Sequence, residues 1–382
     1  MSTEVLAHTG ATTRSAAPAP SKPESPSGGT AKDPLFSNAK LALIVLVVVG
    51  HSWGPLFTDS DTVRAFYMTL YDFHMPAFIL VCGYFSQSFS GRPHQMRRLV
   101  TGVAAPYFIF ALLYGAMRYF TEDEFNPSLL TPYYLLWFLA ALFVWRITAP
   151  IWKLVRYPLV VALVISIGAS TMELPKELDL GRILQFLPFF VAGLLMKREH
   201  FEKLRNPVVR IAGPILSVGI LAAAFFYGND IHIDWIYYTA GATQLDVQWH
   251  TAIGLKLVML AAATVLIATF FAWVPDKQLS FTRMGELTMY PFLLHGFFIK
   301  IAEDGYDLYD IPFVDTGAGA VVITLTALVL AFVLLSKPIR WMTSPLVEPK
   351  LNWILKPTPR PPSPRPRPQA REDKPTAETS TT

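Results

Sequence analysis

One titratable group lies deep inside a long apolar run near the start of the chain. His51 follows the apolar residues 41–50, and Lys40 stands immediately before them. At about 100° and 1.5 Å per residue, the eleven positions from Lys40 to His51 make three helical turns plus roughly 20°, which places both side chains on one face about 16 Å apart. Titratable groups inside a membrane span are costly and mark functional sites. The spacing predicts a cation at one mouth of a helix and an imidazole base within it.

Three more titratable groups are expected at a similar depth. Asp72 and His74 come seven and nine residues into a second apolar stretch, and His295 comes eleven residues into another. At about 1.5 Å per residue, all of them reach the middle part of a bilayer about 30 Å thick. We therefore predict that His51, His74 and His295 converge on one internal site. Asp72 is expected to orient one of their imidazoles.

Two prolines accompany these histidines. Pro76 follows His74 by two residues, and Pro291 precedes His295 by four. Proline removes a backbone donor and commonly bends a helix, and irregular backbone at membrane depth is tolerated mainly beside a buried cavity. Both elements favour an internal site, where an imidazole with a pKa near neutrality is suited to general base catalysis.

Other chemistries have less support. Histidines on separate helices, without an H-x-x-x-H pair, do not predict a metal centre, and we expect none. Ser52 adjoins His51 and points about 100° away from it, which disfavours a Ser-His-Asp triad. Cys82 could carry an acyl group, but no basic residue lies near it in the sequence. A purely structural role of the histidines, as hydrogen-bonding groups between helices, stays open.

The composition indicates a polytopic membrane protein. Of the 382 residues, 52% are hydrophobic and 16% are charged, against ~25% charged residues in a typical soluble domain. Cys82 is the one cysteine, which excludes a disulfide within the chain. We expect a disordered cytosolic arm over residues 1–36, a membrane domain over 37–345, and a proline-rich, basic, disordered cytosolic tail over 346–382.

The loops between the apolar stretches alternate in charge. Even-numbered loops carry clusters of Lys and Arg, whereas odd-numbered loops carry Asp and Glu. The positive-inside rule then predicts an all-α integral membrane protein of the cell membrane, with about ten transmembrane helices and both termini cytosolic. The ten stretches are 39–57, 65–89, 99–119, 131–149, 157–173, 182–197, 208–228, 252–273, 284–302 and 317–336. The basic exceptions in or beside odd-numbered loops are Arg64, Lys176 and Arg182.

Six groups of short motifs follow one another between about residues 37 and 340. They are Asn38-Ala-Lys40 with Leu46-Val-Val-Val-Gly50-His51; Phe73-His74-Met75-Pro76-Ala-Phe78 with Cys82-Gly83-Tyr84-Phe85; Arg97-Arg98-Leu99-Val100 with Pro106-Tyr107-Phe108-Ile109-Phe110; Leu136-Trp137-Phe138-Leu139; Gly181-Arg182 with Phe186-Leu187-Pro188-Phe189-Phe190-Val191-Ala192-Gly193; and Tyr290-Pro291-Phe292-Leu293-Leu294-His295. In this order they resemble the membrane acyltransferase family 3, and within it the branch typified by fucose 4-O-acetylases.

The resemblance implies a ten-helix membrane enzyme that transfers an acyl group, usually acetyl from acetyl-CoA, to a hydroxyl group of a carbohydrate. The family has an arginine eleven positions before its first histidine, where this chain has Lys40. A lysine offers a point charge rather than a planar fork. We expect Lys40, Arg97 and Arg98 to hold the phosphates of acyl-CoA at the cytosolic side.

The expected mechanism is direct transfer. His51 acts as the general base on the acceptor hydroxyl, while His74 and His295 orient the acceptor or polarise the thioester carbonyl. A two-step route through an acyl-enzyme stays open. The alternative function is a transporter or flippase of a glycan or a small polar metabolite, in which the same histidines relay protons. Acyl-CoA, a carbohydrate acceptor and the lipid bilayer are the expected partners, and nucleic acid is not.

Overall fold

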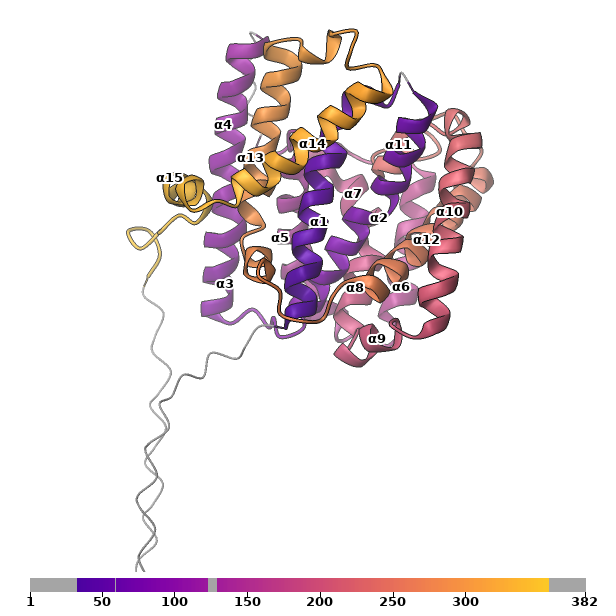
Figure 1. The fold of residues 1–382 in the computed structure, drawn as a ribbon. Helices are drawn as coiled ribbons and strands as arrows, with labels where there is room; N and C mark the ends of the chain where they lie inside the picture. Colours follow the sequence, from indigo (N-terminus) through magenta and orange to yellow (C-terminus); the bar gives the residue numbers. More distant parts are fainter. Residues whose placement is uncertain (1–32, 59, 123–128, 357–382) are drawn as a thin grey trace, which may run out of the picture. The chain divides into compact units, whose positions relative to one another are not determined.

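The computed structural model describes residues 33–58, 60–122 and 129–356, and the statements below refer to them. Residues 1–32 of the predicted arm over 1–36, and residues 357–382 of the predicted tail over 346–382, lie outside these residues. Residues 34–36 and 346–347, which were predicted to be disordered, are helical. Regular structure in the described part is helical throughout (Figure 1), which confirms the predicted all-α class. The helices are α1 (Pro34–Ser52), α2 (Asp61–Phe85), α3 (Pro93–Leu99), α4 (Ala105–Glu122), α5 (Trp137–Trp152), α6 (Pro158–Thr171), α7 (Leu180–Gln185), α8 (Leu187–Leu195), α9 (Arg198–Lys203), α10 (Pro207–Tyr227), α11 (Ile233–Tyr237), α12 (Trp249–Trp273), α13 (Met289–Lys300), α14 (Gly317–Leu334) and α15 (Lys337–Val347).

Seven helical segments in the described part are long and apolar enough to cross a membrane. They are α1, α2, α3 with α4, α5, α10, α12 and α14. The pair α7 and α8, which is bent by 56°, would make an eighth. The predicted stretches 157–173 and 284–302 form α6, with 14 residues, and α13, with 12. Both are shorter than the ~20 residues that span a bilayer, so the number of ten spans stays a prediction.

The helix that carries Lys40 and His51 lies inside the bundle. In the apolar part of α1, 72% of the residues are buried, against 6% in α10 and 22% in α14. α1 packs against α2, α13 and α14. These neighbours shield α1 from lipid, which is the placement expected for a membrane helix with titratable side chains.

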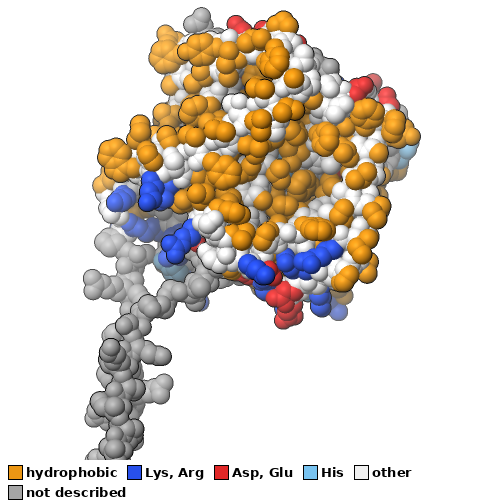
Figure 2. Space-filling model, in the orientation of Figure 1, with side chains coloured by type: hydrophobic (Ala, Val, Ile, Leu, Met, Phe, Trp, Pro, Cys, Tyr) orange, Lys and Arg blue, Asp and Glu red, His pale blue; other side chains and the backbone are white. Residues whose placement is uncertain are grey.

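The outer helices present apolar side chains. Val208, Ile211 and Ile215 on α10 are exposed, as are Val321 and Val329 on α14. Figure 2 shows hydrophobic side chains over most of one face, with lysine and arginine side chains along the lower border of that face. An extended apolar surface of this kind suits contact with lipid, because every backbone polar group of a helix is bonded within the helix.

The two prolines next to the histidines do not interrupt their helices. α2 continues through Pro76 as one helix of 25 residues. Pro291 lies in the first turn of α13, where a missing backbone donor has no partner to lose. The break in a span comes instead between α7 and α8, at Phe186 and Leu187. Pro76 was expected to bend the second apolar stretch, but it does not break α2.

α2 and α8 meet through two glycines. A Cβ atom on Gly83 would lie 2.1 Å from the carbonyl oxygen of Phe190, and one on Gly193 would lie 2.1 Å from that of Leu80. Small residues allow helix backbones in a membrane to approach this closely. The contact matters for the site described next, because α2 also carries His74, nine residues before Gly83.

Enlarging these glycines should destabilise the bundle. We expect Gly193→Ala to lower the free energy of unfolding by about 1–3 kcal/mol, because two packed backbones must separate to admit the methyl group. The measurement is the thermal unfolding midpoint of the purified protein in detergent. Gly219→Ala on α10 is the matched control, since no heavy atom lies within 4 Å of its Cβ position. Equal midpoints for the two variants would contradict the close contact.

Candidate active site

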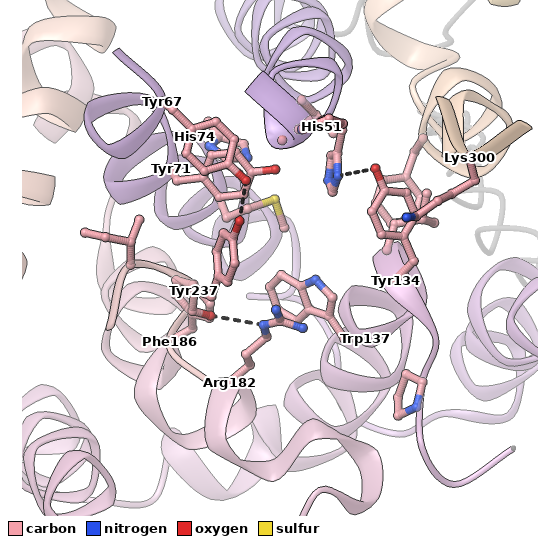
Figure 3. A pocket seen from close by; sticks show the side chains of 18 of the residues that line it. His51, Tyr67, Tyr71, His74, Tyr134, Trp137, Arg182, Phe186, Tyr237 and Lys300 are labelled. Carbon is pink, nitrogen blue, oxygen red and sulfur yellow. Dashed lines mark hydrogen bonds between the residues drawn. The ribbon is translucent and has the colours of Figure 1, made fainter. Parts of the chain in front are cut away.

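A cavity of about 390 Å³ opens at the end of α1 that carries His51. Residues of α1, α2, α5, α7 and α13 line it, together with α11 from the connection between α10 and α12. Figure 3 shows His51 on one side of this cavity and Tyr237 with Arg182 on the other. The polar and aromatic lining residues are His51, Tyr67, Tyr71, His74, Tyr134, Trp137, Arg182, Phe186, Tyr237, Phe292, Lys300 and Glu303.

His51 is held by a tyrosine from a different helix. Its Nδ1 lies 2.9 Å from the hydroxyl oxygen of Tyr134, in the short 3-10 turn Tyr134–Leu136 that precedes α5. The Tyr134 ring meets the imidazole edge-on, with 4.8 Å between centroids. When Nδ1 donates its proton to the tyrosine oxygen, Nε2 is the unprotonated nitrogen and can accept a proton. The tyrosine hydroxyl can also donate to Nδ1, so the contact orients the ring and is compatible with the tautomer that a general base requires.

His295 lies directly against His51. Their ring centroids are 5.1 Å apart, and His295 is fully buried. Its Nδ1 donates to the carbonyl oxygen of Pro291 at 2.7 Å, one turn earlier on α13. A carbonyl oxygen only accepts, so the neutral ring carries its proton on Nδ1 and presents a bare Nε2. That Nε2 has no hydrogen-bond partner among the described residues.

His74 repeats this arrangement on α2. Its Nδ1 donates to the carbonyl oxygen of Leu70 at 2.7 Å, and its buried Nε2 has no partner in the described part of the chain. The ring of Tyr71 contacts both His74 and His51. The distance between ring centroids is 4.8 Å to His74 and 5.9 Å to His51. The structure thus brings His51, His74 and His295 together, as their matched depths predicted. No group of three or more His, Cys, Asp or Glu side chains in the described residues is arranged to hold a metal ion.

Asp72 does not join the histidines, and the prediction that it orients an imidazole is wrong. Its Oδ1 accepts a hydrogen bond of 3.2 Å from the hydroxyl of Tyr238. The three imidazoles have other Nδ1 partners. Asp72 and His74 lie about 200° apart on a regular helix. Because α2 stays unbroken at Pro76, the two side chains point to different neighbours.

Three tyrosines form one side of the cavity, called the tyrosine wall below: Tyr67, Tyr71 and Tyr237. The hydroxyls of Tyr67 and Tyr237 lie 2.5 Å apart. Tyr71 packs against both rings, with its centroid 4.2 Å from that of Tyr67 and 5.4 Å from that of Tyr237. Burial raises the pKa of Tyr237, so its phenol stays protonated. Among the aromatic residues of the connection between α10 and α12, Tyr237 lines the cavity.

Two cations of the cavity were not assigned to the site from the sequence. Arg182 on α7 donates from Nε to the carbonyl oxygen of Tyr237 at 3.0 Å, and its guanidinium lies 4.9 Å from the Trp137 ring centroid. Lys300, at the end of α13, forms ion pairs with Glu303 at 2.9 Å and Asp304 at 3.4 Å. Arg182 had one sequence signal, since it breaks the alternation of loop charges.

Lys40, Arg97 and Arg98 were expected to bind the phosphates of acyl-CoA. Lys40 lies near the other end of α1, and the three side chains do not all come together. Arg98 lines a second pocket of about 330 Å³ with His94 and Arg146, and Phe85 also lines it. Lys40 Nζ lies 5.4 Å from the Phe85 ring centroid. Lys40 therefore lies beside the pocket that Arg98 lines, and the two residues share Phe85 as a neighbour.

Arg97 points elsewhere. Its Nη1 donates to the carbonyl oxygens of Leu355 at 3.2 Å and Lys356 at 2.5 Å, and its Nη2 donates to Asn352 at 2.7 Å. Consecutive residues of a helix project about 100° apart, so Arg97 and Arg98 face different surroundings. The guanidinium of Arg97 thus binds the segment that follows α15.

Comparison with known proteins assigns this architecture to a family. Residues 36–336 match the model of the acyltransferase domain of acyltransferase family 3. The chain therefore belongs to this family and is a membrane-bound acyltransferase. It is also 24% identical over 311 residues to the nodulation protein NolL of Sinorhizobium fredii (strain NBRC 101917 / NGR234), which covers 72% of this chain and 80% of NolL. No solved structure matches the chain. The assignment supports the enzyme over the transporter that the histidines also allowed.

Removing the hydroxyl that holds His51 should slow acyl transfer. We expect Tyr134→Phe to lower kcat about tenfold, because one hydrogen bond of roughly 1–1.5 kcal/mol no longer holds the His51 imidazole in place. The measurement is acetyl transfer from acetyl-CoA by the purified protein. Tyr133→Phe changes the neighbouring tyrosine, which does not line the cavity, and should keep the wild-type rate. A wild-type rate for Tyr134→Phe would show that this contact does not support the base.

Proposed function

We propose that the enzyme is an O-acyltransferase that moves an acetyl group from cytosolic acetyl-CoA to a hydroxyl group of a carbohydrate, with His51 as the general base. The observation that carries this proposal is the cavity in which His51, bonded through Nδ1 to Tyr134, faces Tyr237 and Arg182. Aromatic rings stack on the apolar faces of sugars, and phenol, guanidinium and imidazole groups can bond the hydroxyls. NolL aligns with this chain over most of the length of both proteins.

The chemistry follows from the tautomers of the histidines. Nε2 of His51 takes the proton of the acceptor hydroxyl while the acceptor oxygen attacks the thioester carbonyl carbon. The tetrahedral intermediate then expels the CoA thiolate, which takes the proton from the His51 imidazolium. A bare Nε2 on His74 accepts a hydrogen bond from the acceptor and so orients it. His295 contacts His51 and holds the ring in place.

The developing oxyanion needs a hydrogen-bond donor. His74 and His295 carry their protons on Nδ1, which is bonded to backbone carbonyls. A neutral ring in this tautomer cannot donate from Nε2. Arg182 and Lys300 line the cavity and carry donors, so we assign the polarisation of the thioester carbonyl to them rather than to the histidines.

The basic pocket at the other end of α1 suits the phosphates of the donor. Lys40 lies beside it, and Arg98, Arg146 and His94 line it. Lys40 and His51 are separated by about 16 Å along α1, so the acyl arm of the donor would extend along this helix. With the predicted cytosolic termini, the basic pocket would lie at the cytosolic face. The cavity around His51 then lies toward the opposite face.

The base assignment has a direct test. We expect His51→Ala to abolish transfer of labelled acetyl from acetyl-CoA to a sugar by purified protein in detergent, because the base is removed whose ring Tyr134 orients through Nδ1. His250→Ala replaces an exposed histidine at the start of α12 and serves as the control. Full transfer by His51→Ala would refute the assignment. Labelled protein trapped without an acceptor would instead favour an acyl-enzyme route.

Substitutions of Arg97 and Arg98 should differ in their effect on the binding of acetyl-CoA. We expect Arg98→Ala to raise the KM for acetyl-CoA about tenfold, the loss of one charge-assisted contact with a phosphate. Arg97→Ala should leave this KM near wild type, because the Arg97 guanidinium is bonded to the 352–356 segment. Steady-state kinetics with acetyl-CoA as the varied substrate compare the pair. The reverse order of effects would place the donor on the Arg97 side of α3.

A further inference from the structure

A buried polar cluster lies behind the tyrosine wall and takes no part in the mechanism above. It comprises Asp72 on α2, Gln185 on α7, Lys256 on α12 and Tyr238, which follows α11. None of these side chains is more than 5% exposed. Charged side chains at membrane depth are rare and costly unless they are paired. A cluster built from three helices and one connection therefore indicates a purpose.

Tyr238 is the centre of the cluster. Its hydroxyl donates to Asp72 Oδ1 at 3.2 Å, while Lys256 Nζ lies 3.7 Å from the centroid of its ring. Phe186 stacks on the same ring, with 4.2 Å between centroids. One aromatic side chain thus contacts a carboxylate through its hydroxyl and an ammonium group through its π face.

The backbone of Tyr238 is strained. Its φ of 59° and ψ of 30° lie in the left-handed region, which a bulky residue rarely adopts. Such a conformation persists when the surroundings over-determine it. This residue ends α11 and sends adjacent side chains in different directions. Tyr237 reaches the cavity and bonds Tyr67, whereas Tyr238 enters the buried cluster.

Gln185 ties the cluster to α7. Its Nε2 donates to the carbonyl oxygens of Tyr238 at 3.2 Å and Ala240 at 3.3 Å, and its Oε1 accepts from Lys256 Nζ at 3.1 Å. One turn earlier on α7, Arg182 donates to the carbonyl oxygen of Tyr237. Side chains of α7 therefore bond three carbonyl oxygens of the segment 237–240. The bond from Arg182 to the Tyr237 carbonyl also holds the Arg182 side chain in the cavity.

We propose that Asp72, Lys256 and Gln185 are positioning residues for the carbohydrate acceptor. They hold Tyr238 in its left-handed conformation and so set Tyr237 and Arg182 in the cavity. This inference rests on the proposed function in one respect, namely that the acceptor binds between His51 and the tyrosine wall. The role of Asp72 is then on the acceptor side, away from the imidazoles.

The test compares kinetics for the two substrates. The variants are Asp72→Asn, Tyr238→Phe, Lys256→Met and the paired Asp72→Asn/Lys256→Met, which removes both buried charges together. The probes are labelled acetyl-CoA and the methyl glycoside, from a panel of monosaccharides, that the wild type acetylates best. We expect the KM for the glycoside to rise about tenfold or more while the KM for acetyl-CoA stays within about twofold. Thr264→Val, two turns further along α12, is the control and should change neither constant.

A second readout does not depend on any activity. In a Cys82→Ala background, which has no other cysteine, Tyr237→Cys is labelled with a maleimide, with and without Lys256→Met. We expect labelling to become about fivefold faster with Lys256→Met, because the 237–240 segment opens more often. An unchanged labelling rate would overturn the positioning role of Lys256, whether or not the enzyme acetylates a glycoside. Failure of the wild type to acetylate any glycoside would refute the proposed function instead.

Folding of the variants decides the remaining outcomes. Size-exclusion chromatography in detergent shows whether each variant is monodisperse. If single charge removal prevents folding, the paired variant carries the kinetic test, since it leaves no unpaired charge. A wild-type KM for the glycoside in any folded cluster variant would overturn the proposal. Loss of folding in all four variants would also overturn it, because the cluster would then serve the whole bundle rather than the acceptor wall.

Discussion

Polar groups at membrane depth must find partners inside the protein, and this requirement shapes the interior of the bundle. His51 finds Tyr134, while His74 and His295 each bond a carbonyl one turn earlier on their own helices. For His74 and His295 these bonds also fix the proton on Nδ1, because a carbonyl oxygen only accepts a hydrogen bond. The reactive state of the site is thus set by the same contacts that make its burial tolerable.

The position of α1 divides the molecule into two chemical ends. Its first turns stand beside a basic pocket that contains Arg98, and its last turn carries His51 into an aromatic cavity. Enclosure of α1 by α2, α13 and α14 protects both ends from lipid. The glycine contact between α2 and α8 supports this arrangement by fixing the helix that carries His74 and two tyrosines of the wall, Tyr67 and Tyr71.

The histidines were predictable because depth in a span depends mainly on the number of residues from its end. His51, His74 and His295 converge as that count indicated. Asp72 and Arg97 were not predictable, because direction around a helix decides a side chain's partner. Asp72 faces Tyr238, and Arg97 faces the 352–356 segment. One feature of the sequence singled out Arg182, namely that it is a basic residue beside an acidic loop. Its partner could not be predicted, because the Tyr237 carbonyl lies in a connection distant in sequence.

The sequence by itself determined the membrane class, the helical stretches and the axial depth of each titratable group, because hydropathy and rise per residue are local properties. Only the tertiary structure decided which groups meet. The left-handed turn at Tyr238 is the clearest case. No local propensity favours a buried tyrosine there, and the conformation depends on Asp72, Gln185 and Lys256, which lie on three other helices. Contacts between residues so far apart in the chain arise from packing, which local sequence patterns do not encode.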